Sequence, residues 1–182
     1  MRGDTLQRYK VFGILMICIF AGCRQIPEGI EPVTEFELDR YLGTWYEIAR
    51  FDHWFERDLV NVTATYSLRD DGGIDVLNRG YNPAGNEWKE AKGRAYSVSS
   101  ADVAQLKVSF FRPFYGGYNV IELDREGYRW ALVCGPSRDY LWILAREPHL
   151  PQDIIDTLVS QANELGFDTD ALIWVDQGKY ND

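Results

Sequence analysis

The chain has 182 residues, of which 46% are hydrophobic, and a formal net charge of −9. An acidic chain without a basic stripe is repelled by nucleic acid, so we expect no nucleic-acid partner. The length fits one domain that is large enough to bury a hydrophobic core.

The N-terminus has the pattern of a secretion signal. Three basic residues among the first ten precede the apolar run 11–20, which is too short to span a bilayer as a helix. The run ends in Phe20-Ala21-Gly22-Cys23, which resembles the lipobox of bacterial lipoproteins, in which the cysteine is acylated and becomes the new N-terminus. We therefore expect residues 1–22 to be removed and Cys23 to be lipidated. An ordinary secretory signal and a transmembrane anchor are the alternatives.

Residue 24 indicates which of the two bacterial membranes holds the lipoprotein. In lipoproteins of this kind an Asp after the Cys favours the inner membrane, and this chain has Arg24, so the resemblance implies the outer membrane, with the domain facing the periplasm. Processing removes three Lys or Arg and one Asp, which takes the formal charge from −9 to −11. Acyl chains, and not attraction to anionic lipid, must then hold the protein to the membrane. After processing only Cys134 is free, so no internal disulfide can form.

Residues 23–35 are polar, contain two prolines and have no sustained period, so we interpret them as a tether before a domain at 36–182. Eight runs of strand-like alternation follow, separated by turn residues. They are 44–51, 60–69, 73–80, 87–98, 104–111, 117–124, 128–134 and 140–146. The period then changes to that of an amphipathic helix at 152–165, bounded by Pro151 and Gly166. A short apolar run at 171–175 predicts a ninth strand.

This order predicts an all-β fold: an eight-stranded antiparallel up-and-down β-barrel, with one C-terminal α-helix packed outside and a short ninth strand. Closure removes the exposed edges that eight consecutive strands would otherwise leave. One end of the barrel then receives the start of the first strand and the end of the eighth. We therefore expect Arg146 to stack on the ring of Trp45 and to plug that end.

Alternation also predicts which side chains face inward. They are Val62, Ala64, Tyr66 and Leu68 in the second run; Ile74, Val76 and Asn78 in the third; Gly93, Ala95 and Ser97 in the fourth; Leu106, Val108 and Phe110 in the fifth; Tyr118, Val120 and Glu122 in the sixth; and Trp142 and Leu144 in the eighth. In the seventh run, Trp130 with Leu132 and Ala131 with Val133 remain open alternatives. The small residues Gly93 and Ala95 favour a cavity over a filled interior.

The far end of the barrel is rich in aromatic residues. Its loops at 52–59 and 112–116 contain His53, Trp54 and Phe55, and Pro113, Phe114 and Tyr115. These loops either fold over the barrel as a lid or meet a lipid, a membrane surface or a second subunit.

Three motifs in this strand plan resemble the signature regions of lipocalins. They are Gly43-x-Trp45 in the first strand, Asp124 after the sixth and Arg146 at the end of the eighth. The second region usually reads Thr-Asp-Tyr, whereas this chain has Leu123-Asp124-Arg125, so only the Asp carries over. The resemblance covers about residues 36–176 and is greatest to bacterial outer-membrane lipoprotein lipocalins and to apolipoprotein D.

The resemblance implies a calyx that binds fatty acids or lysophospholipids, with storage or transport for envelope maintenance under stress, and a homodimer for which the aromatic mouth is a plausible surface. Pocket positions of the apolipoprotein D relatives match Tyr66, Asn78 and Trp142. The other expected lining residues are Val76, Phe110, Tyr118 and Leu144. The alternative is a structural or interaction lipoprotein with a filled barrel.

Enzymatic and metal-dependent functions have little support in the sequence. The only histidines, His53 and His149, lie in a mouth loop and in the turn before the helix, so neither a triad nor a metal cluster is indicated. Glu47 and Glu122 would form a carboxylate pair only if both faced inward. We expect no catalytic residue, no metal and no cofactor.

Overall fold

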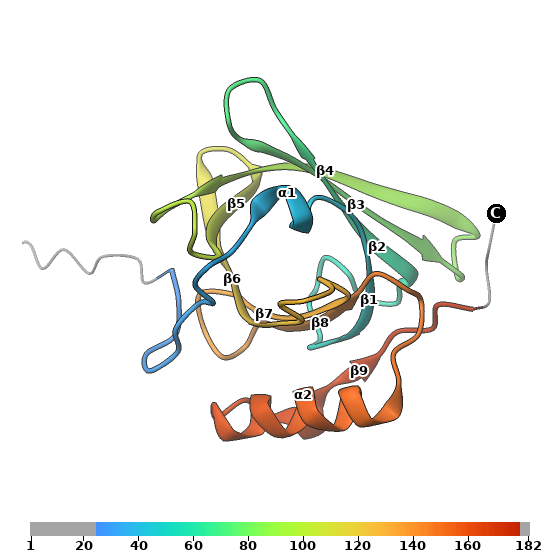
Figure 1. Cartoon of the computed structure of the whole chain (residues 1–182). Helices are drawn as coiled ribbons and strands as arrows, with labels where there is room; N and C mark the ends of the chain where they lie inside the picture. Colours follow the sequence, from blue (N-terminus) through green and yellow to red (C-terminus); the bar gives the residue numbers. More distant parts are fainter. Residues whose placement is uncertain (1–24, 179–182) are drawn as a thin grey trace, which may run out of the picture.

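Alternation of apolar and polar residues produces eight long strands in the computed structural model, which describes residues 25–178 (Figure 1). The elements are α1 (Leu38–Tyr41), β1 (Gly43–Arg50), β2 (Val60–Leu68), β3 (Ile74–Asn82), β4 (Glu87–Ser97), β5 (Gln105–Phe111), β6 (Phe114–Leu123), β7 (Trp130–Cys134), β8 (Leu141–Ala145), α2 (Gln152–Glu164), a 3₁₀ turn (Thr169–Ala171) and β9 (Ile173–Trp174). Within the described residues no helix has the length and apolar composition needed to cross a membrane.

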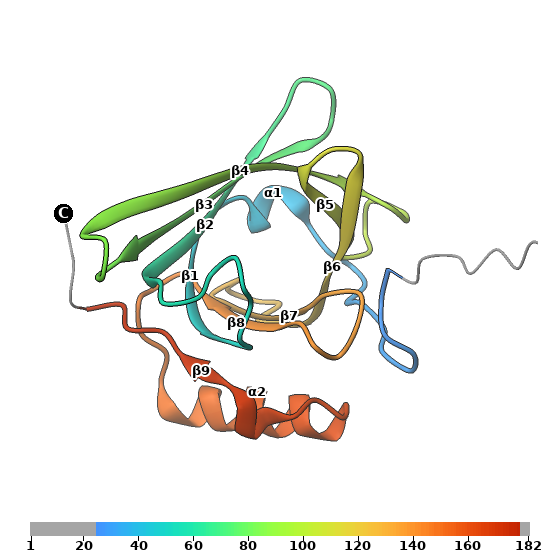
Figure 2. The ribbon, with the colours of Figure 1, turned by 180° about the vertical axis from the view of Figure 1, so that it is seen from behind.

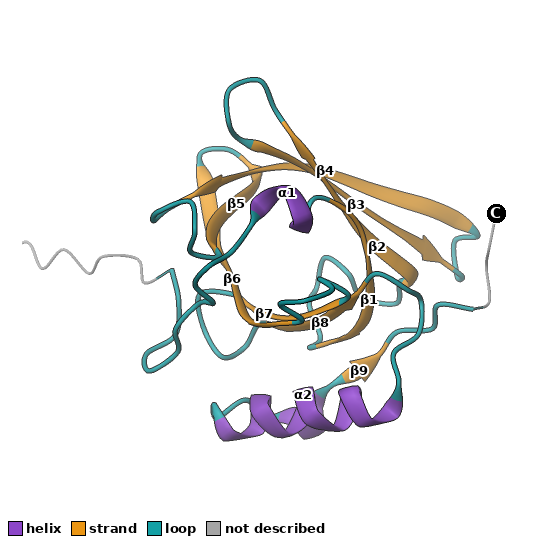
Figure 3. Ribbon diagram, viewed as in Figure 1, coloured by secondary structure: helices purple, strands orange, loops and turns teal. Residues whose placement is uncertain are grey.

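Strands β1 to β7 each pair with the next strand in sequence, and β1 also pairs with β8, which closes the barrel. The short strand β9 pairs with Ala49 and Arg50 at the C-terminal end of β1. Figure 3 shows the strands as one closed ring with α2 outside it. The predicted fold class is therefore confirmed, including the outer helix and the ninth strand.

Helix α2 covers one outer wall of the barrel, as the view from behind also shows (Figure 2). Its Leu158 and Ala162 are completely buried in a second core between the helix and the outer faces of β1, β7 and β8. Gly166, with φ of +82°, follows the helix in a conformation that favours glycine. The apolar stripe predicted from helical spacing is the face that the barrel covers.

The barrel has two hydrophobic cores, an inner core inside the barrel and a second core under α2. They show which side chains of β7 face inward, a question that alternation left open. Ala131 and Val133 belong to the inner core, whereas Leu132 belongs to the core under α2. In β6 a bulge between Val120 and Glu122 shifts the register, so that Glu122 pairs with Leu132. The expectation that Glu122 faces inward is wrong, because the bulge adds one residue to the alternation. Leu68 is also not interior, since it ends β2 and is exposed.

Residues 25–35, predicted as a tether, are folded along the barrel wall. Val33 donates its backbone N–H to the carbonyl of Val120 at 2.9 Å, and its own carbonyl accepts from Ala104 at 2.9 Å. Ile30 and Val33 are buried. The tether interpretation is therefore wrong for this segment, because its isolated apolar residues pack one by one and leave no period. The predicted signal 1–22 and the predicted lipidation site Cys23 lie outside the described residues.

Candidate functional site

One end of the barrel, here called the floor, is closed by Trp45 and Arg146, as the strand order predicts. The guanidinium carbon of Arg146 lies 3.9 Å from the centre of the Trp45 ring, which is a cation–π contact. The indole Nε1 of Trp45 donates to the carbonyl of Tyr41 at 2.8 Å. Trp45 is fully buried, so it forms part of the container and is not an accessible wall.

Arg146 also joins segments that are far apart in the sequence. Its guanidinium donates to the carbonyls of Arg40, Leu42 and Thr44 at 2.7, 2.8 and 2.9 Å. These carbonyls lie at and just after the end of α1, where the last carbonyl groups of a helix have no hydrogen-bond donors within the helix. Gly43 permits this approach, because its φ is +93° and a Cβ there would lie 3.3 Å from Arg146 Nη1.

Asp124 holds the turn between β6 and β7. Its carboxylate accepts from the backbone N–H of Gly127 at 3.2 Å and from Arg129 Nε at 2.6 Å. Burial alone would raise the pKa of Asp124, but the hydrogen bonds from Arg129 and the turn backbone outweigh it and hold the pKa below its usual range. The turn presents Tyr128, whose hydroxyl accepts from the N–H of Glu37 at 2.9 Å, so Asp124 supports the floor.

Three tyrosines form a polar level above the floor. The hydroxyl of Tyr118 lies 2.7 Å from that of Tyr41 and accepts from that of Tyr66 at 2.9 Å. The three come from α1, β2 and β6, so they span the inside of the barrel. Burial is the main cause that raises the pKa of all three phenols. This level is therefore polar but uncharged.

All seven predicted pocket residues lie on the inner face of the barrel: Tyr66, Val76, Asn78, Phe110, Tyr118, Trp142 and Leu144. They differ in exposure. Tyr66, Val76 and Leu144 are buried in the inner core. Asn78, Phe110, Tyr118 and Trp142 are only partly buried. A side chain on the inner face of a barrel keeps exposed surface only where the interior is not filled, so these four mark the accessible wall.

Asn78 is the polar group of this wall. Its neighbours across β2 and β4 are the small residues Ala64 and Ala91. Its Oδ1 is buried and has no hydrogen-bond partner among residues 25–178. An unpaired buried acceptor is costly, so this atom is well suited to accept a hydrogen bond from a hydroxyl or an ammonium group of a ligand.

The open part of the interior is not where the sequence placed it. Carbon atoms of the Phe110 ring lie 2.9 Å from the position that a Cβ of Gly93 would take, and Ala95 is buried in the inner core. The argument for a cavity at Gly93 and Ala95 is therefore wrong, because Phe110 from the next strand fills that space. Access lies nearer the mouth, where residues 87–93 of β4 pair with β3 but not with β5.

Opposite the floor, the mouth contains a cluster of charged residues. A bulge between Glu47 and Ala49 turns both Glu47 and Arg50 inward, beside Leu144 and Trp142 of β8. Arg50 Nη1 donates to Glu47 Oε1 at 3.1 Å, and Nη2 donates to the carbonyl of Glu56 at 2.7 Å. Arg50 is 2% exposed and Glu47 is 4% exposed. We call Glu47, Arg50, His53, Glu56 and Trp142 the mouth cluster.

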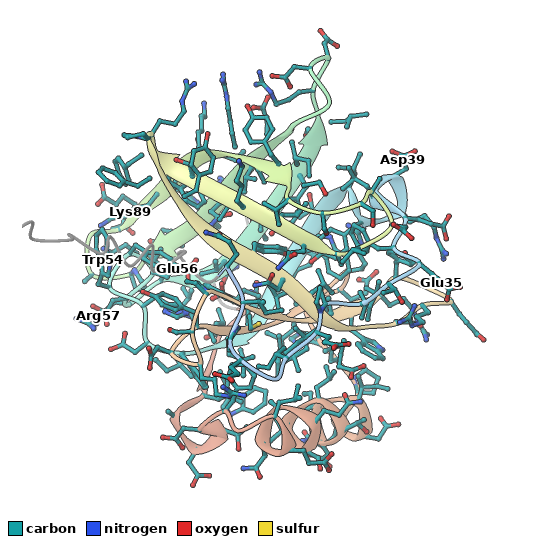
Figure 4. The ribbon with its side chains drawn as sticks, turned by 90° about the vertical axis from the view of Figure 1, so that its left-hand side faces the viewer. Glu35, Asp39, Trp54, Glu56, Arg57 and Lys89 are labelled. Atoms are coloured by element: carbon teal, nitrogen blue, oxygen red, sulfur yellow. The ribbon has the colours of Figure 1, made fainter. Side chains whose placement is uncertain are left out.

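The loop 51–59 folds into the mouth through this cluster. Trp142 Nε1 donates to Glu56 Oε2 at 3.2 Å. The ring of His53 lies 4.6 Å from that of Trp142 and stacks at 5.0 Å on Tyr140. Burial, with help from Arg50, lowers the pKa of His53 to about 4, so the imidazole is neutral at pH 7. Figure 4 shows Trp54 and Glu56 at this end and Asp39 at the floor end.

The two carboxyl groups of the mouth cluster titrate abnormally. Burial raises the pKa of Glu47 well above its usual range, and the nearby Glu56 raises it further against the opposing effect of Arg50. Burial also raises the pKa of Glu56, although the hydrogen bond from Trp142 and the charge of Arg50 oppose it. From the sequence, the carboxylate that could pair with Glu47 was that of Glu122. The actual partner of Glu47 comes from the mouth loop, which no strand pattern could place.

Glu56→Gln is expected to make the protein more stable than the parent at pH 8 but not at pH 4. A carboxyl whose pKa is raised on folding binds more protons in the folded state, so its stabilising contribution is full below the unfolded pKa and is lost as the pH rises through the folded pKa. Glutamine keeps an acceptor for Trp142 and removes this loss. Urea unfolding from pH 4 to 8 measures the difference. The exposed Glu147→Gln serves as the control, and equal pH profiles for Glu56→Gln and the parent would contradict the expectation.

The outside of the mouth carries exposed aromatic side chains. Trp54 and Phe55 on the loop 51–59, and Phe111 and Phe114 on the β5–β6 hairpin, are exposed. His53 and Glu56 from the same loop are buried. The loop 51–59 therefore covers the mouth with its buried residues and leaves the rings of Trp54 and Phe55 exposed.

The site is thus a cup with a sealed floor, a neutral polar level, a partly open apolar wall and a charged mouth. Among residues 25–178 no group of three or more His, Cys, Asp or Glu side chains is placed to hold a metal ion. Cys134 is buried, and burial raises the pKa of its thiol to about 12. The geometry of the whole site suits the binding of an apolar molecule that has a polar end.

The chain belongs to the lipocalin family, because the family described as a lipocalin-like domain matches residues 36–177. It is 53% identical to the outer membrane lipoprotein Blc of Vibrio cholerae, over 92% of this chain and 98% of that protein. It is 33% identical to mouse apolipoprotein D, over 83% of this chain and 82% of the relative. The solved structure of the cockroach allergen Per a 4 has the same fold, with a TM-score of 0.67, 19% identity and coverage of 85% of this chain and 96% of that one.

Proposed function

We propose that the protein is a lipid-anchored lipocalin that binds fatty acids or lysophospholipids in its calyx and stores or transports them for envelope maintenance under stress. The observation that carries the proposal is the partly exposed inner wall, where Phe110, Tyr118 and Trp142 share the inner face with the unpaired acceptor of Asn78. Such a wall combines a large apolar area with few polar groups, as small-molecule sites do.

In this proposal the acyl chain supplies affinity and the polar groups set orientation. Burial of a methylene contributes about 0.8 kcal/mol, so an acyl chain needs no charged partner along its length. The polar head then lies towards Asn78 and the mouth. Arg50 Nε is buried without a hydrogen-bond partner among the described residues, so an acceptor on the head would satisfy it.

The location follows from the leader and the relatives. The lipobox-like sequence before Cys23 and the name of the Vibrio cholerae relative, an outer membrane lipoprotein, support an acylated protein in the outer membrane. We also retain the homodimer as a prediction, because the family resemblance implies it. Sedimentation of the chain without its acyl groups would test it.

The chain without its acyl groups is expected to bind a fluorescent fatty acid and to release it to lysophospholipid. Trp142→Ala should weaken binding about tenfold, which equals about 1.4 kcal/mol, because the variant removes accessible wall and the partner of Glu56. Fluorescence titration of delipidated, refolded protein measures both constants.

Trp174→Ala is the matched control, since Trp174 lies on β9 outside the barrel. Trp142→Phe keeps an aromatic wall and should bind nearly as well as the parent if packing alone matters. Absence of saturable competition in the folded parent would reject the transport proposal and leave a structural lipoprotein with a filled barrel.

A further inference from the structure

The first described residue is fixed to the barrel close to the lipid anchor. Asn119 Nδ2 donates to the carbonyl of Gln25 at 2.8 Å, on the outer face of β6. Gly117 lies under the same backbone, since a Cβ there would overlap Gln25. Cys23 is only two residues before Gln25, and two residues reach at most about 7 Å. If Cys23 is acylated, as the proposed function requires, the membrane surface lies beside the wall of β6.

The β5–β6 hairpin lies a short way along the same strand. Phe111 and Phe114 face each other across it and are 76% and 78% exposed. Three residues of a strand separate Gly117 from Phe114, which is about 10 Å. Figure 4 looks onto this side of the barrel, with the hairpin and the N-terminal segment both facing the viewer. The anchor therefore brings two exposed aromatic rings to the lipid surface.

The charge of this side suits a phospholipid surface. A hollow of about 550 Å³ lies beside the hairpin. Its lining includes the cations Lys92, Arg94 and Arg112, the one carboxylate Asp75, and apolar residues such as Phe110. Asp75 is paired with Arg69 at 2.7 Å and with Arg94 at 3.8 Å. Residues 152–176, which include α2 and β9, hold six carboxylates and no Lys or Arg. Figure 1 places α2 and the β5–β6 hairpin on different sides of the barrel.

We propose that the hairpin tip, formed by Phe111, Arg112 and Phe114, docks onto the phospholipid surface of the membrane that holds the anchor. The rings enter the interfacial region, where aromatic side chains are favoured, and the cations of the hollow meet lipid phosphates. The membrane is favoured over a second copy of the chain as the occupant, because the anchor two residues before Gln25 brings the lipid surface to this hairpin. Docking holds the mouth beside the membrane from which an amphiphile would enter.

Environment-sensitive labels test the docking in the acylated protein. Phe114→Cys carries an NBD group on the hairpin, and Trp174→Cys, which is 51% exposed on β9, carries it on the acidic side. The native Cys134 is buried, and Cys23 bears the lipid. In vesicles of phosphatidylethanolamine and phosphatidylglycerol, we expect a blue-shifted emission and quenching by spin-labelled lipid at residue 114 but not at residue 174.

Two readouts separate this proposal from the proposed function. Flotation of the unlabelled protein with the vesicles tests the anchor, and its failure would overturn both the anchor and the docking. A protein that floats but shows a water-like spectrum at residue 114 would overturn the docking alone. A blue shift that appears without vesicles and grows with protein concentration would assign the hairpin to a second copy, and would also reject the docking. Thermal unfolding of both labelled variants confirms that they are folded.

Discussion

Arg50→Met is expected to lower the free energy of unfolding by about 3–5 kcal/mol, the range measured when one member of a buried ion pair is removed. Arg50 is the only cation in contact with Glu47 among the described hydrogen bonds, at 3.1 Å, and it also holds the carbonyl of Glu56 at 2.7 Å. Without it, Glu47 would be buried beside Glu56 with no countercharge. Urea unfolding at pH 7 measures the loss.

Two variants make this expectation specific. Glu47→Gln combined with Arg50→Met removes both charges and should regain a large part of the loss, because the cost arises from the uncompensated carboxylate. Arg57→Met removes an exposed arginine of the loop 51–59, paired with Asp52 at 2.7 Å, and should cost less than about 1 kcal/mol. A loss for Arg50→Met no larger than that for Arg57→Met would show that the mouth cluster does not stabilise the fold.

The fold could be predicted because alternation and turn residues are local signals. Tyr66, Asn78 and Phe110 face inward as expected, because the register irregularities that occur in β2 and β5 leave these residues on the inner face. The contact between Trp45 and Arg146 also followed, because closure of an even number of antiparallel strands brings the ends of the first and last strands together.

The mouth cluster could not be predicted, because it depends on a bulge and on a loop. In the sequence Glu47-Ile48-Ala49-Arg50, strict alternation places Glu47 and Arg50 on opposite faces. The bulge adds one residue to β1 and turns both inward, and nothing in the residue types announces it. Glu56 lies nine residues after Glu47 in an irregular loop, so only the folded chain brings the two carboxyl groups together.

Two other features could not be predicted, because one is too short to show a period and the other is a contact between two strands. Helix α1 has four residues, too few for a period, yet it inserts Tyr41 against Trp45, with ring centres 4.6 Å apart. The filling of the space at Gly93 by Phe110 is a contact between neighbouring strands, so the small residue alone could not reveal it. The sequence therefore identifies the container, whereas the accessible wall depends on contacts that only the structure supplies.

Arg146→Ala is expected to lower the free energy of unfolding by about 3 kcal/mol, and Arg146→Lys by more than half of that amount. A charged donor contributes about 1.5–3 kcal/mol per hydrogen bond, and the cation–π contact adds about 1 kcal/mol, although these contributions are not additive. A single ammonium group cannot reproduce a planar guanidinium that serves the carbonyls of Arg40, Leu42 and Thr44 while it covers Trp45. Urea unfolding gives the loss.

Hydrogen exchange locates the effect of Arg146→Lys. The amides around α1 and the start of β1 should exchange faster, because their segment would lose the group that fixes it to the end of β8, whereas those of α2 should not change. Arg57→Ala is a suitable control, since Arg57 is exposed and its pairing with Asp52 lies at the mouth, away from the floor. If Arg146→Lys matched the parent in both measurements, the floor would depend on the burial of Trp45 alone. Ligand affinity should change less than stability, because Trp45 is fully buried and the guanidinium of Arg146 is engaged with backbone carbonyls at the floor.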